Sequence, residues 1–216
     1  MWGVNKMKKI YLVRHGITDG NLGNQYQLPS TPLAKQGIKD AKLLARRLKS
    51  LPIDVIISSH INRASETAKI IANKMNTVIV EDEIFQEIKR PSIVRGKSKN
   101  DPETKEIMRA VEANFGNPDW KHSDEENFFL LSERAKKALE TILKREEDNI
   151  LIVTHGAFLR MILGVMIYGD KLTPDIFQGV NHTFATSNTG VSIVEYEKQG
   201  WYVKTWNDHA HLGDLE

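Results

Sequence analysis

Two short segments of the chain share a pattern in which a histidine and a glycine follow an apolar run. YLVRHG at residues 11–16 and LIVTHG at residues 151–156 each read as a buried strand that ends in polar residues. Arginine or histidine at the end of an interior strand costs free energy unless the protein uses it. Imidazole has an ordinary pKa of about 6.5, so its neutral form is available near pH 7 as a nucleophile. Arg14, His15 and His155 are therefore candidates for chemistry.

A third apolar run, IDVIISS at residues 53–59, leads into HINRASETA, which puts Arg63 in the first turn of a helix. Backbone N–H groups and the helix dipole favour an anion at such a position. In open α/β sheets, ligands bind at the carboxyl ends of the strands. Two histidines and two arginines at one sheet edge suit a phosphoryl group, because an arginine fork matches phosphate oxygens and keeps its charge. At about 4 Å and an effective dielectric near 20, each cation–anion pair is worth on the order of 4 kcal/mol before desolvation.

The elements that must position these residues follow from the periodicity of the apolar side chains. Short apolar runs predict strands over residues 9–13, 53–59, 77–82, 149–156, 190–197 and 200–206. Helical spacing of apolar residues predicts helices over 33–50, 63–75, 128–145 and 157–167. Thr31 followed by Pro32 has the residue types of an N-cap and a first helical position, and Asn62 is expected to cap the second helix. Residues 16–30 and 168–188 read as polar connecting segments.

Strands that alternate with helices predict a three-layer α/β/α domain with a mostly parallel central sheet. The last two strands are expected to form a hairpin around Gln199 and Gly200. We expect one domain over residues 1–216, with an insertion at about 83–127 in which prolines and glycines interrupt charged, partly helical sequence. This insertion is expected to lie over the sheet edge and cover the active site without forming a second core.

Composition excludes several classes of function. The 30 Lys and Arg against 28 Asp and Glu give a net charge of +2, too small to suggest a nucleic-acid binder. The chain has no cysteine, which excludes disulfides, iron–sulfur clusters, thiolate zinc sites and cysteine nucleophiles. No apolar run approaches the roughly 20 residues of a membrane span, and the N-terminus lacks the apolar stretch of a signal peptide. We expect a cytoplasmic monomer or homodimer, with Met7 as an alternative start and residues 1–6 as an unstructured extension.

Three motifs resemble those of a known family. RHG at residues 14–16, followed by Thr18 and Asn21, resembles the opening motif of the histidine phosphatase superfamily, the phosphoglycerate-mutase-like enzymes. SSHINRASETA is similar to the family's second arginine motif, and VTHGAFLR to its second histidine motif. Together they extend over nearly the whole chain. The resemblance implies a phosphoglycerate-mutase-like fold and an enzyme that acts on a small phosphate monoester and needs neither metal nor cofactor.

The resemblance also implies roles for the matched residues. His15 would be the nucleophile that becomes phosphohistidine. Arg14, Arg63 and His155 would hold the phosphoryl oxygens and stabilise the charge of the transition state. Asn21 would hydrogen-bond the transferring group.

Further positions follow from the same resemblance. The backbone of Gly16 would fix the tautomer of His15, and Gly156 would be a phosphate-binding position. Glu87, in FQEI, looks like the acid with which the family protonates the leaving alcohol; the neighbouring acids that compete for this role are Glu81, Asp82 and Glu83. The sequence departs from the family pattern at Ile17, where Glu or Gln is common, and in KRPSIVRGKS after Glu87. We expect Ile17 to alter the rim of the pocket.

Three functions fit these motifs. A phosphatase is favoured over a mutase, because the insertion is modest and lacks the motifs of the mutases. A non-catalytic phosphate-binding protein on the same fold is a third alternative, which the presence of all four charged or nucleophilic residues disfavours. Substrate specificity is expected to come from residues 88–127 and from the segment 168–188, where His182 could touch substrate. The insertion carries four basic residues that suit a multiply anionic metabolite: Lys89, Arg90, Arg95 and Lys97.

Overall fold

The computed structural model describes residues 7–198 and 200–213, so the expectation for residues 1–6 lies outside the described residues. A six-stranded sheet has the order β3-β2-β4-β1-β5-β6. Its strands are β1 (Lys8–Arg14), β2 (Val55–Ser58), β3 (Ile79–Glu81), β4 (Asn149–Thr154), β5 (Val191–Glu197) and β6 (Gly200–Asp208). The first four pair in parallel, whereas β5 runs antiparallel to both β1 and β6. The mostly parallel sheet is therefore confirmed, and so is the terminal hairpin, although its turn residue Gln199 is not among the described residues.

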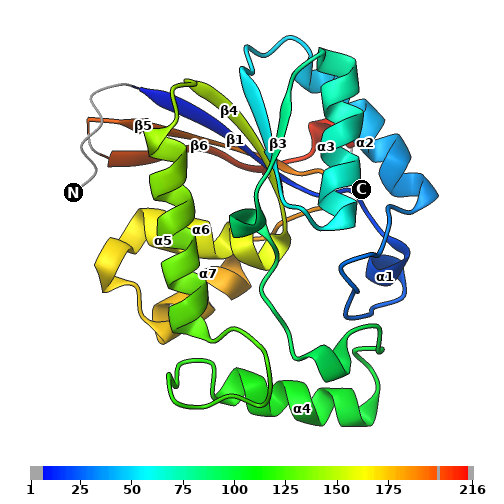
Figure 1. The fold of residues 1–216 in the computed structure, drawn as a ribbon, viewed down its shortest axis with the longest axis vertical. Helices are drawn as coiled ribbons and strands as arrows, with labels where there is room; N and C mark the ends of the chain where they lie inside the picture. The colour runs from blue at the N-terminus through cyan, green and yellow to red at the C-terminus, as the bar shows by residue number, and fades with distance from the viewer. Residues whose placement is uncertain (1–6, 199, 214–216) are drawn as a thin grey trace.

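Helices cover both faces of this sheet (Figure 1). The helices are α1 (Asp19–Leu22), α2 (Lys35–Leu48), α3 (Asn62–Met75), α4 (Pro102–Ala113), α5 (Phe128–Lys144), α6 (Gly156–Tyr168) and α7 (Pro174–Thr183). Helices α2 and α3 pack on one face, and α5 and α6 with α7 on the other. This arrangement confirms the three-layer α/β/α architecture. In the part of the chain that the structure describes, no helix is both long and apolar enough to cross a membrane.

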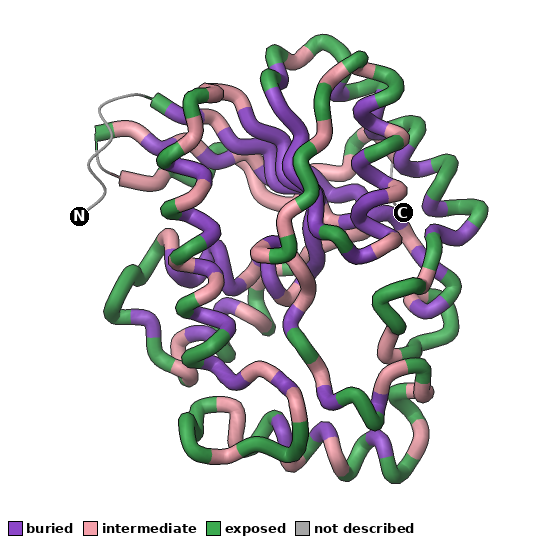
Figure 2. The backbone as a smooth tube through the Cα atoms, in the orientation of Figure 1, coloured by how far each residue is buried: buried purple, intermediate pink, exposed green. Residues whose placement is uncertain are grey.

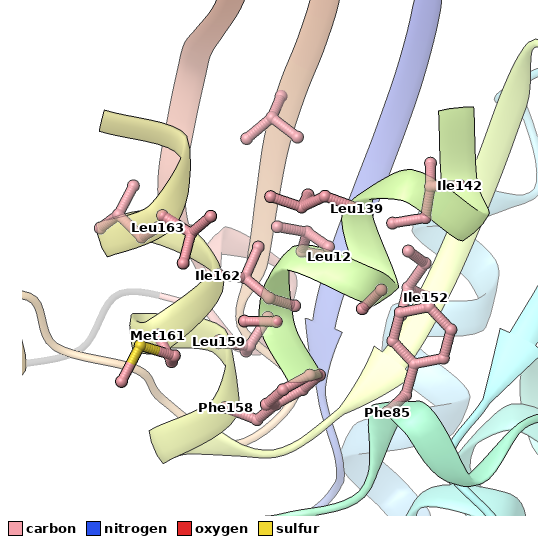
Figure 3. Close-up of a cluster of buried hydrophobic side chains, with 14 of the residues drawn as sticks. Leu12, Phe85, Leu139, Ile142, Ile152, Phe158, Leu159, Met161, Ile162 and Leu163 are labelled. Atoms are coloured by element: carbon pink, nitrogen blue, oxygen red, sulfur yellow. The ribbon is translucent and has the colours of Figure 1, made fainter. Parts of the chain in front are cut away.

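Alternation along the strands divides the core into two apolar layers. Ile10 and Leu12 of β1 point into the layer beneath α5 and α6, while Tyr11 and Val13 point into the layer beneath α2 and α3. All four are at most 1% exposed, and the central strands of the sheet form a continuous buried region in Figure 2. Figure 3 shows the first layer, where Leu12 lies among side chains of the two covering helices. Because both faces are buried, the polar residues at the strand ends are held in fixed positions.

Two of the predicted helix starts differ from the structure. Helix α2 begins at Lys35 rather than at residue 33, and Ala34 is its N-cap without a side-chain cap hydrogen bond. The amide of Ala34 donates instead to the carbonyl oxygen of Ile17 (3.0 Å). The N-cap role predicted for Thr31 is therefore wrong, since the chain is still bound to the loop after β1 at this point. Asn62 is the first residue of α3 rather than its cap.

Both segments predicted as polar connections contain a helix. Helix α1 lies within residues 16–30 and begins with a capping box between Thr18 and Asn21. Helix α7 lies within residues 168–188, and the hydroxyl of Thr173 caps it by accepting from the amide of Ile176 (3.3 Å).

Residues 83–127 contain two short 3₁₀ turns, η1 (Glu83–Phe85) and η2 (Ser92–Val94), followed by α4. Helix α4 lies at the bottom of Figure 1, away from the sheet. Val94, Met108 and Val111 form a small buried cluster there, separate from the two layers on the sheet. This cluster is far smaller than the two layers on the sheet.

Candidate active site

The two histidines meet at the carboxyl edge of the sheet because β1 and β4 are neighbours in register. Arg14 of β1 is paired with Thr154 of β4, so the residues that follow, His15 and His155, leave the sheet side by side. Their ring centroids are 5.1 Å apart, and they are 2% and 0% exposed. Arg63, in the first turn of α3, reaches the same place and is also buried. The structure thus brings together the four residues around which the predicted site was built.

The hydrogen bonds of His15 define its tautomer. Arginine can only donate, and Nε of Arg63 donates to Nε2 of His15 (3.1 Å), so Nε2 carries the lone pair. The proton is then on Nδ1, which donates to the carbonyl oxygen of Gly16 (2.7 Å). The amide of Gly16 in turn donates to Oγ1 of Thr67 (3.0 Å). A neutral imidazole with its lone pair on Nε2 is the form that can act as a nucleophile.

Burial and the two arginines keep both histidines neutral. Burial lowers the pKa of His15 well below its usual value, and the charge of Arg63 adds to this effect. The pKa of His155 is lowered well below its usual value by the same two causes in the same order. Burial also lowers the pKa of Arg63 itself, to about 10, which still leaves it charged at neutral pH.

Two buried nitrogens in this region have no hydrogen-bond partner among the described residues: Nε of Arg14 and Nδ1 of His155. Their neighbouring nitrogens are occupied, since Nη1 of Arg14 donates to the carbonyl of Thr186 (2.6 Å) and Nε2 of His155 lies 2.9 Å from Oγ of Ser59. Buried polar atoms are nearly always paired, so a pair of unpaired nitrogens points to a polar ligand.

Gly156 allows Arg14 to approach this closely. A Cβ atom at Gly156 would lie 2.9 Å from Oγ1 of Thr186 and 3.3 Å from Nε of Arg14. A larger residue would therefore clash with Thr186 and crowd Arg14. Gly156 thus contributes to the site by leaving room for Arg14.

Glu87 lies across the same cavity, with its carboxylate against the N-terminus of α6. Its Oε1 accepts from the amides of Ile88 (3.0 Å) and Phe158 (3.1 Å), and its Oε2 from that of Ala157 (3.4 Å). Burial raises the pKa of Glu87, but the hydrogen bond from the Ile88 amide and the charges of Arg63, Arg90 and Arg14 together outweigh burial and lower the pKa below its usual value. Without a bound anion, Glu87 is therefore ionised at neutral pH.

The competing acids do not reach the cavity. Glu81 is exposed and accepts from the hydroxyl of Ser65, and Asp82 caps η1 by accepting from the amide of Ile84. Glu83 is exposed and lies within η1. The geometry thus favours Glu87 among the four acids.

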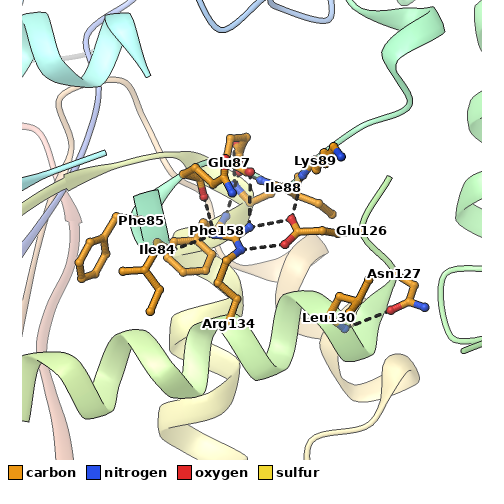
Figure 4. Close-up of polar contacts among 12 residues, drawn as sticks. Ile84, Phe85, Glu87, Ile88, Lys89, Glu126, Asn127, Leu130, Arg134 and Phe158 are labelled. Carbon is orange, nitrogen blue, oxygen red and sulfur yellow. Dashed lines mark hydrogen bonds and ion pairs between the residues drawn. The ribbon is translucent and has the colours of Figure 1, made fainter. Parts of the chain in front are cut away.

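Arg134 of α5 holds the segment that carries Glu87, and the sequence did not single it out (Figure 4). Its Nη1 donates to the carbonyl oxygens of Ile84 (3.0 Å) and Gln86 (2.8 Å), while Nε and Nη2 form a bidentate pair with Glu126 (2.8 and 2.7 Å). Its guanidinium also lies 4.2 Å from the centre of the Phe158 ring. An arginine on the buried side of α5 was the one available signal, because helical periodicity otherwise places apolar residues there.

Asn21 lines the cavity, and its side chain also closes the capping box of α1. Its Oδ1 accepts from the amide of Thr18 (3.1 Å) and lies 3.4 Å from the side-chain nitrogen of Asn188. Ile17 does not line the cavity; its carbonyl oxygen accepts from the amide of Ala34. The expectation that Ile17 alters the rim of the pocket is therefore wrong.

The cavity has a volume of about 370 Å³ and a strongly positive lining. Its basic residues are Arg14, Arg63, Lys89, Arg90, Arg95, Lys99 and Arg160, and among the described residues its lining includes one acid, Glu87. Lys97 lies elsewhere and pairs with Glu103, whereas the sequence missed Lys99 and Arg160. Arg160 follows His155 by five residues on α6 and donates to Oδ1 of Asn181 (2.7 Å) and Oγ1 of Thr186 (2.8 Å). Such a lining suits an anion.

Two of these cations share one carboxylate at the edge of the insertion. Lys89 and Arg95 both pair with Asp124, at 3.4 and 3.0 Å. Over residues 7–198 and 200–213, no ion pair with a carboxylate is found for Arg90, Lys99 or Arg160, and no group of three or more histidines and acids lies close enough to hold a metal ion.

The fold is that of the phosphoglycerate-mutase-like proteins. The model of the histidine phosphatase superfamily (branch 1) matches residues 10–209, and the chain therefore belongs to this superfamily. A protein of Proteus mirabilis (strain HI4320) named probable phosphoglycerate mutase GpmB is 29% identical over 220 residues, which cover 97% of each chain. Among solved structures, Bacillus stearothermophilus YhfR has a TM-score of 0.79 at 26% identity, covering 95% of this chain and 99% of that one. A phosphoserine phosphatase of Entamoeba histolytica shares the fold, with a TM-score of 0.75 at 23% identity over 95% of this chain and 99% of that one.

The lowered pKa values of the histidines make stability depend on pH. A histidine whose pKa is lowered on folding binds fewer protons in the folded than in the unfolded chain, so its stabilising contribution is complete above about pH 6.5 and is lost as the pH falls below that value. We expect the free energy of unfolding to fall below about pH 6.5 by up to about 1.4 kcal/mol per pH unit for each of His15 and His155. His211, whose pKa is lowered to about 4, adds to this slope. Urea unfolding between about pH 7.5 and 5 measures it.

His155→Gln is expected to reduce this slope, while His122→Gln, at an exposed position, should leave it unchanged. An unchanged slope in His155→Gln would show that His155 is not the buried neutral group described here.

Proposed function

We propose that the protein is a phosphomonoester hydrolase that acts on small anionic phosphorylated metabolites through a phosphohistidine on His15. The observation that carries the proposal is the hydrogen bond from Nε of Arg63 to Nε2 of His15 in a cation-lined cavity. This bond requires a neutral ring with its lone pair on Nε2. Membership of a family with phosphatase members supports an enzyme over a non-catalytic phosphate binder.

In the first step, Nε2 of His15 forms a bond to phosphorus while the bond from phosphorus to the leaving oxygen breaks. The guanidinium of Arg63 moves its hydrogen bond from Nε2 to a phosphoryl oxygen, because the lone pair is then used. Gly16 accepts from Nδ1 and so stabilises the positive charge that develops on the ring. Nε of Arg14 and Nδ1 of His155 donate to the other phosphoryl oxygens.

Ser59 supports this assignment for His155. Oγ of Ser59 accepts from the amide of Ile61 (3.2 Å), so its hydroxyl proton is free to be donated to Nε2 of His155. The proton of the neutral ring is then on Nδ1, the atom that would face the phosphoryl group. Asn21 of α1 would donate a further hydrogen bond from its side-chain amide to the transferring phosphoryl group.

Glu87 donates a proton to the leaving oxygen and afterwards takes one from the water that attacks phosphohistidine. In the second step the oxygen of this water bonds to phosphorus, the bond from phosphorus to Nε2 breaks, and phosphate leaves. The three amides around the carboxylate suit the ionised form that acts as the base. A bound phosphate dianion opposes the charges of Arg14 and Arg63, and it therefore raises the pKa of Glu87 for the first step.

Residues 83–127 are proposed to cover the site as part of a single domain over residues 1–216. Support comes from the cavity lining, to which this insertion contributes Lys89, Arg90, Arg95 and Lys99. The cytoplasmic location, the monomeric or homodimeric state and the independence from metals and cofactors stay predictions.

His15→Ala is expected to remove measurable release of phosphate from p-nitrophenyl phosphate, because the neighbouring imidazole of His155 would present a protonated Nδ1, which has no lone pair for attack. In wild-type protein quenched during turnover, mass spectrometry should find one phosphoryl group on the peptide that contains His15. His122→Ala is the control and should retain full activity. Turnover by His15→Ala close to that of wild type would contradict the assignment of the nucleophile, and phosphate binding without turnover in wild type would support the non-catalytic alternative.

The pH dependence of kcat/KM offers a second test, because this ratio reports the free enzyme. His15 must be neutral to attack, and its pKa is lowered by burial and then by Arg63, so the active form persists as the pH falls below about 6.5. After correction for ionisation of the substrate, we expect the acid limb to lie well below pH 6.5. An acid limb at or above that value would mean that the reacting histidine is not shielded from water.

Phosphoryl transfer of the mutase type is the second candidate, because relatives named probable phosphoglycerate mutase match nearly the whole chain. Incubation with 3-phosphoglycerate and a trace of 2,3-bisphosphoglycerate separates the two. We expect release of phosphate from the ester. Interconversion of phosphoglycerate isomers without release would instead establish the mutase.

A further inference from the structure

A second and larger cavity, of about 630 Å³, lies between the insertion and α7. Its walls are the end of α4 and the loop that follows it, α7 along most of its length, Leu131 of α5, and residues 88, 90 and 157. None of the residues proposed for catalysis lines it. Its volume is about 1.7 times that of the cation-lined cavity, so it has room for a substantial group.

The two cavities share part of their walls. Ile88, Arg90 and Ala157 line both. Ile88 and Ala157 are also two of the three residues whose amides hold the carboxylate of Glu87. The group that would protonate the leaving oxygen therefore lies at the boundary between the cavities. If the phosphorus of a bound phosphate monoester lies at His15 and its leaving oxygen at Glu87, the rest of its alcohol group is directed towards this boundary.

We propose that the second cavity binds the leaving group of the substrate, and that this group carries an apolar ring. The inference rests on the proposed hydrolase function and adds the class of substrate, a phosphate monoester of an alcohol that bears a ring. The phosphate would lie between the arginines at the sheet edge, and the ring between α4 and α7.

The chemistry of the walls indicates a ring rather than a second anion. Apolar side chains contribute to the lining, among them Val111, Phe115, Leu131 and Phe177. Asn114, Gln178, Asn181 and His182 add hydrogen-bonding groups. The charged residues are one cation, Arg90, and two exposed carboxylates, Glu112 and Asp175, which disfavour a further anionic group.

Arg90 strengthens the choice of an aromatic group. It lies where the cavities adjoin, and no carboxylate among the described residues is paired with it. A planar guanidinium without an ion pair can stack on the face of a ring and attract it through its quadrupole. The same residue can contact the phosphate side of the site, so it would lie against both ends of the substrate.

Two substitutions on neighbouring residues of α7 test the proposal. Gln178 lines the second cavity, and Gln178→Trp places a bulky side chain in it. Gly179 lines neither cavity, and a Cβ atom there would meet nothing within 4 Å, so Gly179→Trp is the matched control. Ethyl phosphate and 3-phenylpropyl phosphate are suitable probes, because both release a primary alcohol and differ in the bulk of that alcohol.

We expect wild type and Gly179→Trp to prefer 3-phenylpropyl phosphate in kcat/KM. Gln178→Trp should lose roughly tenfold or more of its activity on this ester and keep its activity on ethyl phosphate within about twofold. Equal activity of wild type on both esters, or equal losses on both in Gln178→Trp, would overturn the proposal while leaving the hydrolase function intact.

Failure of the hydrolase function is recognised separately, as absence of phosphate release from either ester. The second cavity is then tested by calorimetric binding of the two esters to the wild-type chain. Tighter binding of 3-phenylpropyl phosphate that is weakened in Gln178→Trp, but not in Gly179→Trp, would support the ring site. Equal affinities for the two esters would overturn it.

Discussion

The hydrogen bond from Nε of Arg63 to Nε2 of His15 is the interaction on which the site depends. It requires an imidazole with its lone pair on Nε2, and the carbonyl of Gly16 holds the proton on the opposite nitrogen. A protonated His15 could not accept this bond and would add a buried positive charge beside two arginines. The fold therefore maintains the neutral ring by burial and by cation placement together. The same arginines that would bind an anion thus also keep the histidine in the form that can attack it.

A comparable constraint acts on the opposite wall of the cavity. Glu87 can face the arginines only if the irregular segment between η1 and η2 is held in place, and this segment has no sheet or long helix of its own. Arg134 supplies the hold from α5 by binding two backbone carbonyls and Glu126 at once. A half-buried bidentate pair of this kind fixes direction as well as distance. The position of the proposed proton donor is thus set by a helix from which none of the described residues lines the cation-lined cavity.

The parts of the site that could be predicted from sequence are those in which position along the chain fixes position in space. A residue that directly follows a parallel strand must lie at the carboxyl edge of the sheet, which is why Arg14, His15 and His155 were placed together. Arg160 was missed because it acts across contacts that no local pattern encodes. For Arg134 the helical pattern could show an arginine on the buried side of α5, but not the backbone carbonyls that it binds. The helix starts make the same point. Thr-Pro occurs twice in the chain and was taken as an N-cap at Thr31, yet the pair that caps a helix is the one at Thr173.

Tertiary contacts decide which of the two Thr-Pro pairs caps a helix. They also fix the sheet edge and the insertion separately. After Thr31, the backbone is bound to the loop that carries Ile17, so α2 starts only when these contacts end. That loop belongs to the sheet edge, which holds the histidines and is fixed by the two large apolar layers. The insertion is fixed by a small cluster of its own around Val94 and Met108. Changes in the insertion can therefore reshape both cavities while the sheet edge that holds the histidines stays intact.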